Sequence, residues 1–394
     1  MSVISPYNFR GGCPDPGSFP VAHLIEGASR RLAAEGRDLV LYPDPQGYPP
    51  LRQIAADRFE HREGVCLPIE SIVLTGGSMQ ALALIIEALT KPADTVITEA
   101  FSYAGTLKLL RRYDLRIVGI ETDDGGMDLD ALERQLKALD NRGTPPRFIY
   151  TIATYQNPTG AILARPRRQR LLEISRAFNV PIIEDNCYAD LHLDGDHPPP
   201  AMRALPGGAE VIYVASFSKI LGPGARLGYM SAPQPFVKRV LELKIDGGTN
   251  ALASMILADY FERHLWDHVS EVCGVLRHKR YAVLAALERH LRDLCVWSKP
   301  AGGMFIWVGL PPQIDVHALA RQAEAENVVY GRGRDFDSGD RDIAYLRLSF
   351  GYPKLEDIPI GIERLARAVR AAVPGRSNSR SGSCARSDSS SRLT

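Results

Sequence analysis

The fold is best approached from the stretch Val211-Ile-Tyr-Val-Ala-Ser-Phe-Ser-Lys-Ile-Leu-Gly-Pro-Gly-Ala-Arg-Leu-Gly228. Its first seven residues form a short apolar run with β-branched and aromatic side chains, which predicts a buried strand ending near Phe217. Lys219 follows at once, in a loop rich in Gly and Pro that leads to Arg226. A lysine at the end of a buried strand is unusual, because burying an ammonium group without a partner is costly.

Lys219 allows two interpretations. As an imine the lysine is neutral and avoids that cost, and a lysine imine is how pyridoxal phosphate (PLP) is held in enzymes. The hydroxyls of Ser216 and Ser218 and the guanidinium of Arg226 suit the phosphate of such a cofactor. Alternatively, Lys219 is an ordinary lysine on a surface loop. This stretch alone does not decide between the two.

Short apolar runs alternate with helical stretches through the first half of the chain. Strands are expected near residues 71–75, 95–99, 116–120, 147–151 and 180–184, and helices near 79–89, 103–113, 129–139 and 165–178. This alternation predicts an α/β fold, a mainly parallel sheet sandwiched by helices. Ligands of such sheets gather at the carboxyl ends of the strands. We therefore expect a site there, formed by Gly77, Ser78, Asn157, Asp185 and Lys219.

The pattern changes after Tyr229 and predicts a second, smaller α+β domain. Helices are expected at 236–245, 252–264, 269–294, 317–326 and 355–372, and strands at 303–308 and 345–350. Residues 1–20 are too rich in Gly and Pro for regular structure, and helices are expected at 21–35 and 51–61. We predict an N-terminal segment (1–40), a large PLP-binding domain (41–270), a small C-terminal domain (271–373) and a disordered Ser/Arg-rich tail (374–394).

Composition is that of an ordinary globular protein, with 394 residues, 45% hydrophobic, 24% charged and a formal net charge of +1. The charge offers no case for nucleic-acid or membrane partners. The start of the chain lacks a signal-peptide core, and no apolar run is long enough to span a bilayer. The cysteines have no metal-ligand spacing, so no metal is expected; we predict reduced thiols in a cytoplasmic protein. They are Cys13, Cys66, Cys187, Cys273, Cys295 and Cys384.

Four further positions suit PLP, and each has a simpler explanation. Asp185 at a strand end is able to keep the pyridine nitrogen protonated, or to cap a turn. Asn157 and Tyr188 are able to hydrogen-bond the ring oxygen, although Asn-Pro and Thr-Gly are common turn formers. Tyr103 is able to stack on the ring, or to be a core aromatic residue.

Taken together, these motifs resemble the fold-type I PLP-dependent aminotransferases of the class I/II superfamily. The most similar branch contains 2-aminoadipate and kynurenine aminotransferases and the aminotransferase-like half of MocR regulators. The resemblance covers residues 8–372 and rests on nine motifs in family order. They are Phe9…Pro14-Asp-Pro…Phe19-Pro20, Tyr42…Gly47…Leu51-Arg52, Thr75-Gly-Gly-Ser-Met-Gln-Ala-Leu82, Glu99…Tyr103, Gln156-Asn-Pro-Thr-Gly160, Glu184-Asp-Asn-Cys-Tyr188, Ser216-Phe-Ser-Lys219…Arg226-Leu-Gly228, Pro300-Ala-Gly-Gly-Met-Phe305 and Leu346-Arg-Leu-Ser-Phe350.

The resemblance implies a role for each matching position. Lys219 is the catalytic residue, which forms the imine with PLP and then moves the α-proton. The implied cofactor-binding residues are Tyr42, Gly77, Ser78, Met79, Tyr103, Asn157, Asp185, Tyr188, Ser216, Ser218, Lys219 and Arg226. Gly12, Asn157 and Arg347 are implied to bind the substrate, with Arg347 clamping its α-carboxylate. Tyr42 is implied to reach the partner's cofactor phosphate, which requires a homodimer with shared active sites.

Two features depart from the family pattern. Met79 and Ser349 stand where relatives often have polar side chains, so Met79 is expected to offer only its backbone N–H. The segment Asp246-Gly-Gly-Thr-Asn250, which approaches the partner's site in relatives, has an unusual double glycine. This second departure weakens any transfer of substrate preference.

The expected function is transamination between an L-amino acid and a 2-oxo acid by a ping-pong cycle. Glutamate and 2-oxoglutarate are the expected co-substrates by family analogy. One alternative is a PLP-dependent lyase or cyclase of specialised amino-acid metabolism. A less favoured one is a ligand-sensing module like that of a MocR protein, since the resemblance begins near Asn8 with no expected space for a DNA-binding domain.

Overall fold

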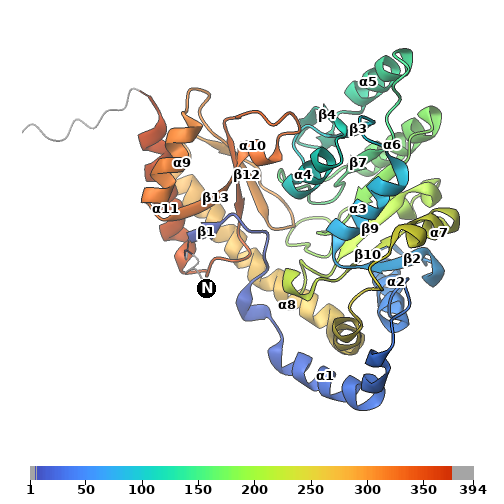
Figure 1. Cartoon of the computed structure of the whole chain (residues 1–394). Helices are drawn as coiled ribbons and strands as arrows, with labels where there is room; N and C mark the ends of the chain where they lie inside the picture. Colours follow the sequence, from blue (N-terminus) through green and yellow to red (C-terminus); the bar gives the residue numbers. More distant parts are fainter. Residues whose placement is uncertain (1–4, 6, 375–394) are drawn as a thin grey trace, which may run out of the picture.

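The computed structural model describes residue 5 and residues 7–374, and its larger lobe is built on a seven-stranded sheet (Figure 1). The strand order is β2-β10-β9-β8-β7-β3-β4. In that order the strands are β2 (Ile72–Thr75), β10 (Gly228–Ser231), β9 (Ile212–Ser216), β8 (Ile182–Asp185), β7 (Ile149–Thr151), β3 (Thr95–Glu99) and β4 (Arg116–Ile120). Only β10 runs antiparallel to its neighbours, so β2 and β9, on either side of it, point the same way.

Successive residues of the central strands belong to different hydrophobic cores. Val96, Tyr150 and Ile183 pack in one core, whereas their neighbours pack in the other. Because side chains alternate across a strand, the two cores lie on opposite faces of the sheet. Both faces are therefore covered by helices, as expected for a buried parallel sheet. The helices of this lobe are α2 (Pro49–Glu63), α3 (Ser78–Leu89), α4 (Ala104–Arg112), α5 (Leu129–Asn141), α6 (Arg165–Phe178) and α7 (Gln234–Leu243).

The smaller lobe has a five-stranded sheet with the order β1-β13-β14-β12-β11. These strands are β1 (Tyr7–Phe9), β13 (Val328–Arg332), β14 (Tyr345–Ser349), β12 (Phe305–Gly309) and β11 (Val296–Trp297). The helices of the small lobe are α9 (Val316–Ala325), α10 (Gly333–Phe336) and α11 (Asp357–Ala372). The large lobe also has a separate short hairpin, which joins β5 (Thr122–Asp123) to β6 (Gly126–Met127). β1 pairs in parallel with β13, so the start of the chain is part of this lobe.

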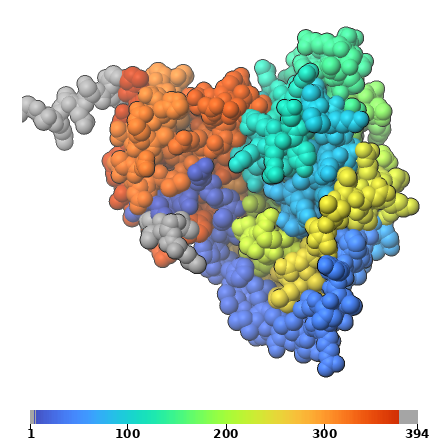
Figure 2. Space-filling view, in the orientation of Figure 1, coloured from blue at the N-terminus to red at the C-terminus, as the bar shows by residue number. Residues whose placement is uncertain are grey.

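A helix of 41 residues, α8 (Ala251–Leu291), joins the two lobes. It packs against α2 of the large lobe and α11 of the small one, and α1 (Val21–Glu35) packs along its first half. Figure 2 shows the orange small lobe and the teal part of the large lobe facing each other across the molecule. Residues 10–20 run between β1 and α1 and so pass from one lobe to the other.

The predicted architecture, a mainly parallel sheet with helices on both faces and a smaller α+β lobe, is confirmed. Two local predictions are wrong. Helices were expected at 252–264 and 269–294, but a single continuous helix covers Ala251–Leu291, because nothing between the two stretches breaks a helix. Residues 7–9 form a strand although a loop was expected, since β13, itself unpredicted, supplies their hydrogen bonds. The predicted tail lies almost entirely outside the described residues.

Candidate active site

The topology brings four strand ends to one edge of the large sheet. β2, β9, β8 and β7 all point the same way, so their carboxyl ends meet there. β8 ends at Asp185 itself, and β9 is followed within three residues by Lys219. β2 leads through two glycines into α3, and Asn157 lies in the loop after β7. The polar residues predicted from the sequence therefore converge on one edge.

Lys219 is directed at the N-terminal segment. Its Nζ donates a hydrogen bond to the Gly12 carbonyl oxygen (2.8 Å) and lies 5.7 Å from the centre of the Tyr188 ring. In the described part of the chain it forms no ion pair with a carboxylate. Burial lowers the pKa of the Lys219 ammonium. A lysine that loses its proton easily is suited to act as a nucleophile or a base.

Asp185 is buried and only half paired. Its Oδ2 accepts a hydrogen bond from the Tyr150 hydroxyl (2.7 Å), while its Oδ1 has no partner among the described residues. Burial raises the pKa of Asp185, and the nearby Cys187 and the hydrogen bond from Tyr150 act in the opposite direction. A buried polar atom without a partner is costly and marks a place for a ligand. A protonated pyridine nitrogen is a donor of the right charge for Oδ1, so this position fits PLP.

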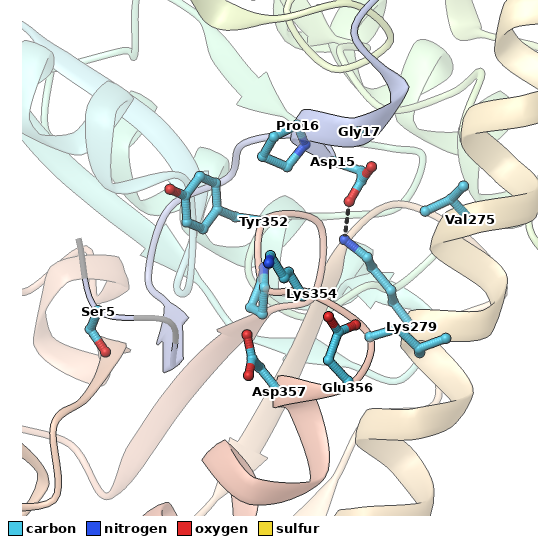
Figure 3. Close-up of a pocket in the computed structure, with 12 residues that line it drawn as sticks. Ser5, Asp15, Pro16, Gly17, Val275, Lys279, Tyr352, Lys354, Glu356 and Asp357 are labelled. Carbon is cyan, nitrogen blue, oxygen red and sulfur yellow. Dashed lines mark hydrogen bonds and ion pairs between the residues drawn. The ribbon is translucent and has the colours of Figure 1, made fainter. Parts of the chain in front are cut away.

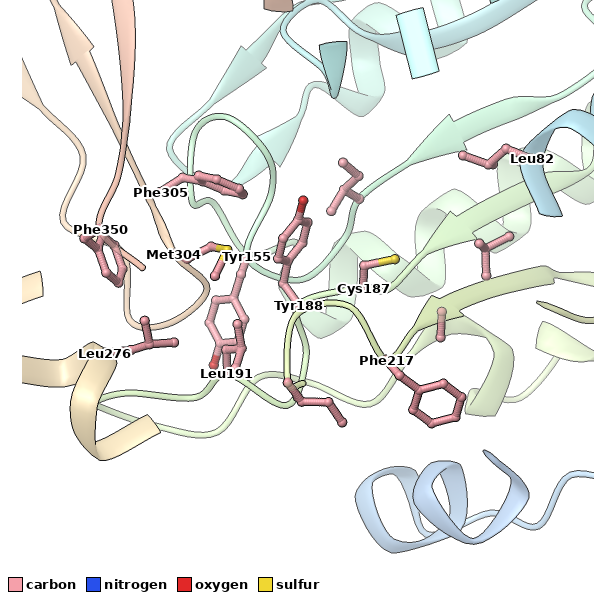
Figure 4. Packing of buried hydrophobic residues seen from close by; sticks show 14 of the residues in the cluster. Leu82, Tyr155, Cys187, Tyr188, Leu191, Phe217, Leu276, Met304, Phe305 and Phe350 are labelled. Atoms are coloured by element: carbon pink, nitrogen blue, oxygen red, sulfur yellow. The ribbon is translucent and has the colours of Figure 1, made fainter. Parts of the chain in front are cut away.

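Asn157 links two other candidate residues. Its Nδ2 donates to the Tyr188 hydroxyl (3.0 Å), and its Oδ1 accepts from Arg347 Nη1 (2.8 Å). Asn157 is fully buried, and Tyr188 packs edge-on against Phe305 with ring centres 5.3 Å apart (Figure 4). The amide therefore connects the large lobe, which carries Tyr188, with β14 of the small lobe, which carries Arg347.

Arg347 is a buried guanidinium without an anion. Its Cζ lies 4.1 Å from the Phe305 ring centre and 4.5 Å from that of Phe336, and its Nη2 donates to the Arg10 carbonyl oxygen (2.5 Å). Its Nε has no partner, and no carboxylate of the described residues pairs with it. Burial lowers the pKa of Arg347 to about 10, so it is still a cation at neutral pH. A carboxylate ligand is the group this arrangement lacks.

Groups suited to a phosphate gather where α3 begins. Gly77 has a φ of +92°, and a Cβ there would lie 3.1 Å from Arg226 Nη2. The Ser216 and Ser218 hydroxyls lie 2.8 Å apart, and Arg226 donates to the Gly76 carbonyl oxygen (2.6 Å) without a carboxylate partner in the described chain. The N–H groups of the first turn of a helix have no partner within the helix and attract anions. This corner therefore fits the phosphate of PLP.

The remaining predicted residues lie in three different settings. Ser78 begins α3, and Met79 packs its side chain against the core. Tyr103 immediately precedes α4, and burial, together with the charge of Asp185, raises the pKa of its phenol. Tyr42 is apart from the others and exposed; a Cβ on Gly247 would lie 3.5 Å from its ring. Within one subunit, the structure does not bring Tyr42 to the site.

The sequence did not predict several residues that contact this cluster. Tyr150 holds Asp185, but a tyrosine inside a buried strand gives no sign of its partner. Phe305 and Phe336 pack against Arg347, and of these two only Phe305 belongs to one of the family motifs. Gly12 is one of the predicted substrate-binding residues, but the sequence does not show that its carbonyl oxygen accepts from Lys219. The Arg10 carbonyl oxygen accepts from Arg347. Backbone groups carry no sequence signal.

A buried lysine holds the N-terminal segment in place. Lys279 on α8 donates to the Asp15 carboxylate and to the Gly351 carbonyl oxygen (2.7 Å), as Figure 3 shows for Asp15. Asp15 Oδ2 accepts in turn from the backbone N–H of Ser18 (3.0 Å). These contacts anchor the loop whose carbonyl groups meet Lys219 and Arg347.

Within the described residues, no helix is long and apolar enough to cross a membrane. The same residues contain no group of three or more His, Cys, Asp or Glu side chains placed to hold a metal ion.

Comparison with known proteins gives concordant matches. Residues 11–365 match the family model described as aminotransferase class I and II. The chain is 35% identical to aromatic-amino-acid aminotransferase 1 of Thermococcus litoralis, over 91% of this chain and 87% of that protein. Its structure resembles the multiple substrate aminotransferase of Thermococcus profundus, with a TM-score of 0.87, 33% identity and coverage of 94% and 92%. It also resembles the α-aminoadipate aminotransferase LysN of Thermus thermophilus, complexed with N-(5'-phosphopyridoxyl)-L-leucine, with a TM-score of 0.85, 32% identity and 92% coverage of both chains.

Proposed function

Because the chain belongs to the class I and II aminotransferases, and is thus a PLP-dependent transaminase of fold type I, we propose that its strand-end cluster is the active site. The observation that carries this proposal is the meeting of three incomplete groups at one sheet edge. They are the Lys219 amine, the half-paired Asp185 carboxylate and the Arg347 guanidinium without an anion. Each lacks a partner that PLP or an amino acid would supply.

Bound PLP supplies an electron sink for the carbanion that forms at the substrate α-carbon. Asp185 Oδ1, which has no partner, would accept the hydrogen bond of the ring nitrogen, and Asn157 and Tyr188 would bind the ring oxygen. Tyr103 would pack against the ring. The groups that would bind the phosphate are Ser216, Ser218, Arg226 and the first-turn N–H groups of Ser78 and Met79.

Two basic side chains divide the work on the substrate. Arg347 would bind the α-carboxylate through its planar fork, and Asn157 keeps that fork in orientation through its Oδ1 (2.8 Å). Lys219 would hold PLP covalently in the resting enzyme, and its Nζ would move the proton of the substrate α-carbon. Burial lowers the pKa of the Lys219 ammonium, which increases the fraction of neutral amine able to take that proton.

The substrates we propose are an L-amino acid and a 2-oxo acid, used in turn, with glutamate and 2-oxoglutarate as one pair. The choice of first donors to test comes from the relatives, which are named for aromatic amino acids and α-aminoadipate. Gly12 lies beside Lys219 and Phe305, where a Cβ would be 3.1 Å from the Phe305 ring. A side chain at position 12 would therefore occupy space next to the catalytic amine, which supports a role for Gly12 in admitting substrate.

We further propose that the enzyme is a homodimer with shared active sites. Three consecutive apolar side chains are open to solvent: Val40 (85% exposed), Leu41 (69%) and Tyr42 (90%). The segment around Tyr42 lies against residues 247–248, and Ile245, two residues before Gly247, is 91% exposed. Exposed apolar clusters of this kind are typical of protein interfaces. A partner subunit covering this patch would bury Tyr42, as the predicted reach of Tyr42 to the partner's cofactor phosphate requires.

The domain division and the cellular location are also proposals. The boundary between the large domain (41–270) and the small domain (271–373) falls within α8, a helix with contacts in both lobes. We propose the cytoplasm as the location, since the five described cysteines are free thiols.

A half-reaction tests the proposed function. Pure protein loaded with PLP is mixed with L-glutamate, and with aromatic amino acids and 2-aminoadipate, while the absorbance of bound cofactor is followed. We expect conversion to the pyridoxamine form with one equivalent of 2-oxo acid per site. Release of ammonia or thiol without the pyridoxamine form would indicate a lyase and contradict the proposal.

A further inference from the structure

Tyr150 lies next to Asp185 at the centre of the large sheet. It belongs to β7, in register with Ile183 of β8, and so shares a face with Asp185, two residues further along β8. The Tyr150 side chain is fully buried. Its hydroxyl is 2.7 Å from Asp185 Oδ2 and 3.1 Å from Thr106 Oγ1, a residue of α4.

The direction of these hydrogen bonds follows from the chemistry of the groups. An ionised carboxylate only accepts, so Tyr150 must donate its one proton to Asp185. The Thr106 hydroxyl must then donate to the Tyr150 oxygen. The result is a series of hydrogen bonds that runs in one direction, from Thr106 through Tyr150 to Asp185. Thr106 lies in the first turn of α4, which begins just after Tyr103.

The chain of hydrogen bonds settles which carboxylate oxygen is free. Oδ2 is taken by Tyr150, and Oδ1 is the buried oxygen without a partner. A carboxylate fixed at one oxygen cannot turn about its Cβ–Cγ bond without breaking that hydrogen bond. Oδ1 is therefore held in one direction before any ligand binds.

We propose that Tyr150 is a positioning residue of the transaminase, which aims Asp185 Oδ1 at the ring nitrogen of PLP and keeps the carboxylate ionised there. This inference rests on the proposed role of Asp185. A hydrogen bond donated to the charged form stabilises that form, against the burial that raises the pKa of Asp185. Without it, the carboxylate would be the stronger base and would draw the shared proton away from the ring nitrogen. The other titratable groups that face Asp185 are Cys187, Lys219, Tyr103 and Tyr188.

The test replaces only the hydroxyl, in the PLP-loaded enzyme. Tyr150→Phe removes the donor to Asp185, and Tyr229→Phe is the matched control, since Tyr229 is equally buried and its hydroxyl has no hydrogen-bond partner among the described residues. Thr106→Val removes the first donor of the chain. Protonation of the ring nitrogen is measured by nitrogen-15 NMR of bound labelled PLP, and the half-reaction with an active amino donor is measured in parallel.

For Tyr150→Phe we expect the nitrogen-15 signal to move toward the unprotonated value and the half-reaction rate constant to fall about tenfold, the usual effect of one hydrogen bond to a charged group. KM should change by less than about threefold, because the substrate carboxylate contacts Arg347. Thr106→Val should shift both readouts in the same direction by less, and Tyr229→Phe should match the wild type. If Tyr150→Phe does not fold, Thr106→Val carries the test.

Two results would overturn the inference: a nitrogen-15 signal for Tyr150→Phe equal to that of Tyr229→Phe, or, where only Thr106→Val folds, a wild-type signal for Thr106→Val. Failure of the proposed function looks different, because the wild type itself would then not convert bound PLP with any amino donor.

Discussion

Replacing Arg347 by lysine separates binding of the α-carboxylate from every other task of the site. The guanidinium makes two directed hydrogen bonds, to Asn157 Oδ1 (2.8 Å) and the Arg10 carbonyl oxygen (2.5 Å), and lies between the rings of Phe305 and Phe336. A lysine retains the charge but not the fork, so one charge-assisted hydrogen bond to the substrate is lost, worth about 1.5–3 kcal/mol. Since about 1.4 kcal/mol is tenfold, kcat/KM for amino acids should fall about 10- to 100-fold.

The assay compares an amino acid with a primary amine of the same side chain that lacks the carboxylate. Arg347→Lys should lose the stated factor with the amino acid and change little with the amine, and its affinity for PLP should equal that of the wild type. The same fractional loss with both donors would refute the carboxylate role of Arg347, as would a loss of PLP affinity without any change in the preference for the amino acid.

Three further predictions follow from other contacts. Lys279→Met should release the loop anchored at Asp15, with faster hydrogen–deuterium exchange in residues 8–19 and a raised KM at nearly constant kcat. Lys279→Arg is the control, and unchanged exchange in Lys279→Met would contradict the anchoring role. The Ile245→Glu protein should be monomeric when its mass is measured by light scattering. Val296→Glu is the control and should stay dimeric, because Val296 is 74% exposed but lies in the small lobe. A dimeric Ile245→Glu protein would place the interface elsewhere. Lys219→Met should stabilise the PLP-free protein, because burial lowers the pKa of Lys219 and folding must bury the ammonium. The gain in the free energy of unfolding is complete below the pKa of Lys219 in the folded protein and disappears as pH rises to the ordinary lysine value of 10.5. Denaturation curves in which the gain grows with rising pH would refute this prediction.

The family, fold class, cofactor and type of reaction expected from the sequence are confirmed. They were predictable because β7, β8 and β9 are short apolar runs, and a polar residue that is unusual beside a buried strand lies at or after the end of each. These residues are Asn157 after β7, Asp185 at the end of β8 and Lys219 after β9. The carboxyl ends of parallel strands meet at one edge of the sheet, which brings the three residues together. The individual roles of these residues stay predictions.

What the sequence did not yield depends on contacts between distant segments. The strand at Tyr7–Phe9 exists because β13, more than 300 residues later, pairs with it. The partner of Lys219 and one of the two partners of Arg347 are backbone carbonyl groups, which have the same chemistry at every position. In the sequence, Tyr150 is one residue of an apolar run, and nothing shows which group its hydroxyl binds. Only the fold places Asp185 of β8 beside that hydroxyl. Side-chain pairing across a sheet depends on the register of two strands, and β8 is distant from β7 in the sequence.

The central claim is that Lys219 holds PLP covalently, and reductive trapping tests it most directly. The PLP-loaded protein is treated with borohydride, digested and mapped by mass spectrometry. We expect one reduced phosphopyridoxyl group per chain, on Lys219, and none in a Lys219→Ala protein that still binds PLP through its phosphate contacts. A stoichiometric adduct on another lysine, such as Lys279, or no adduct on a PLP-saturated chain, would contradict it.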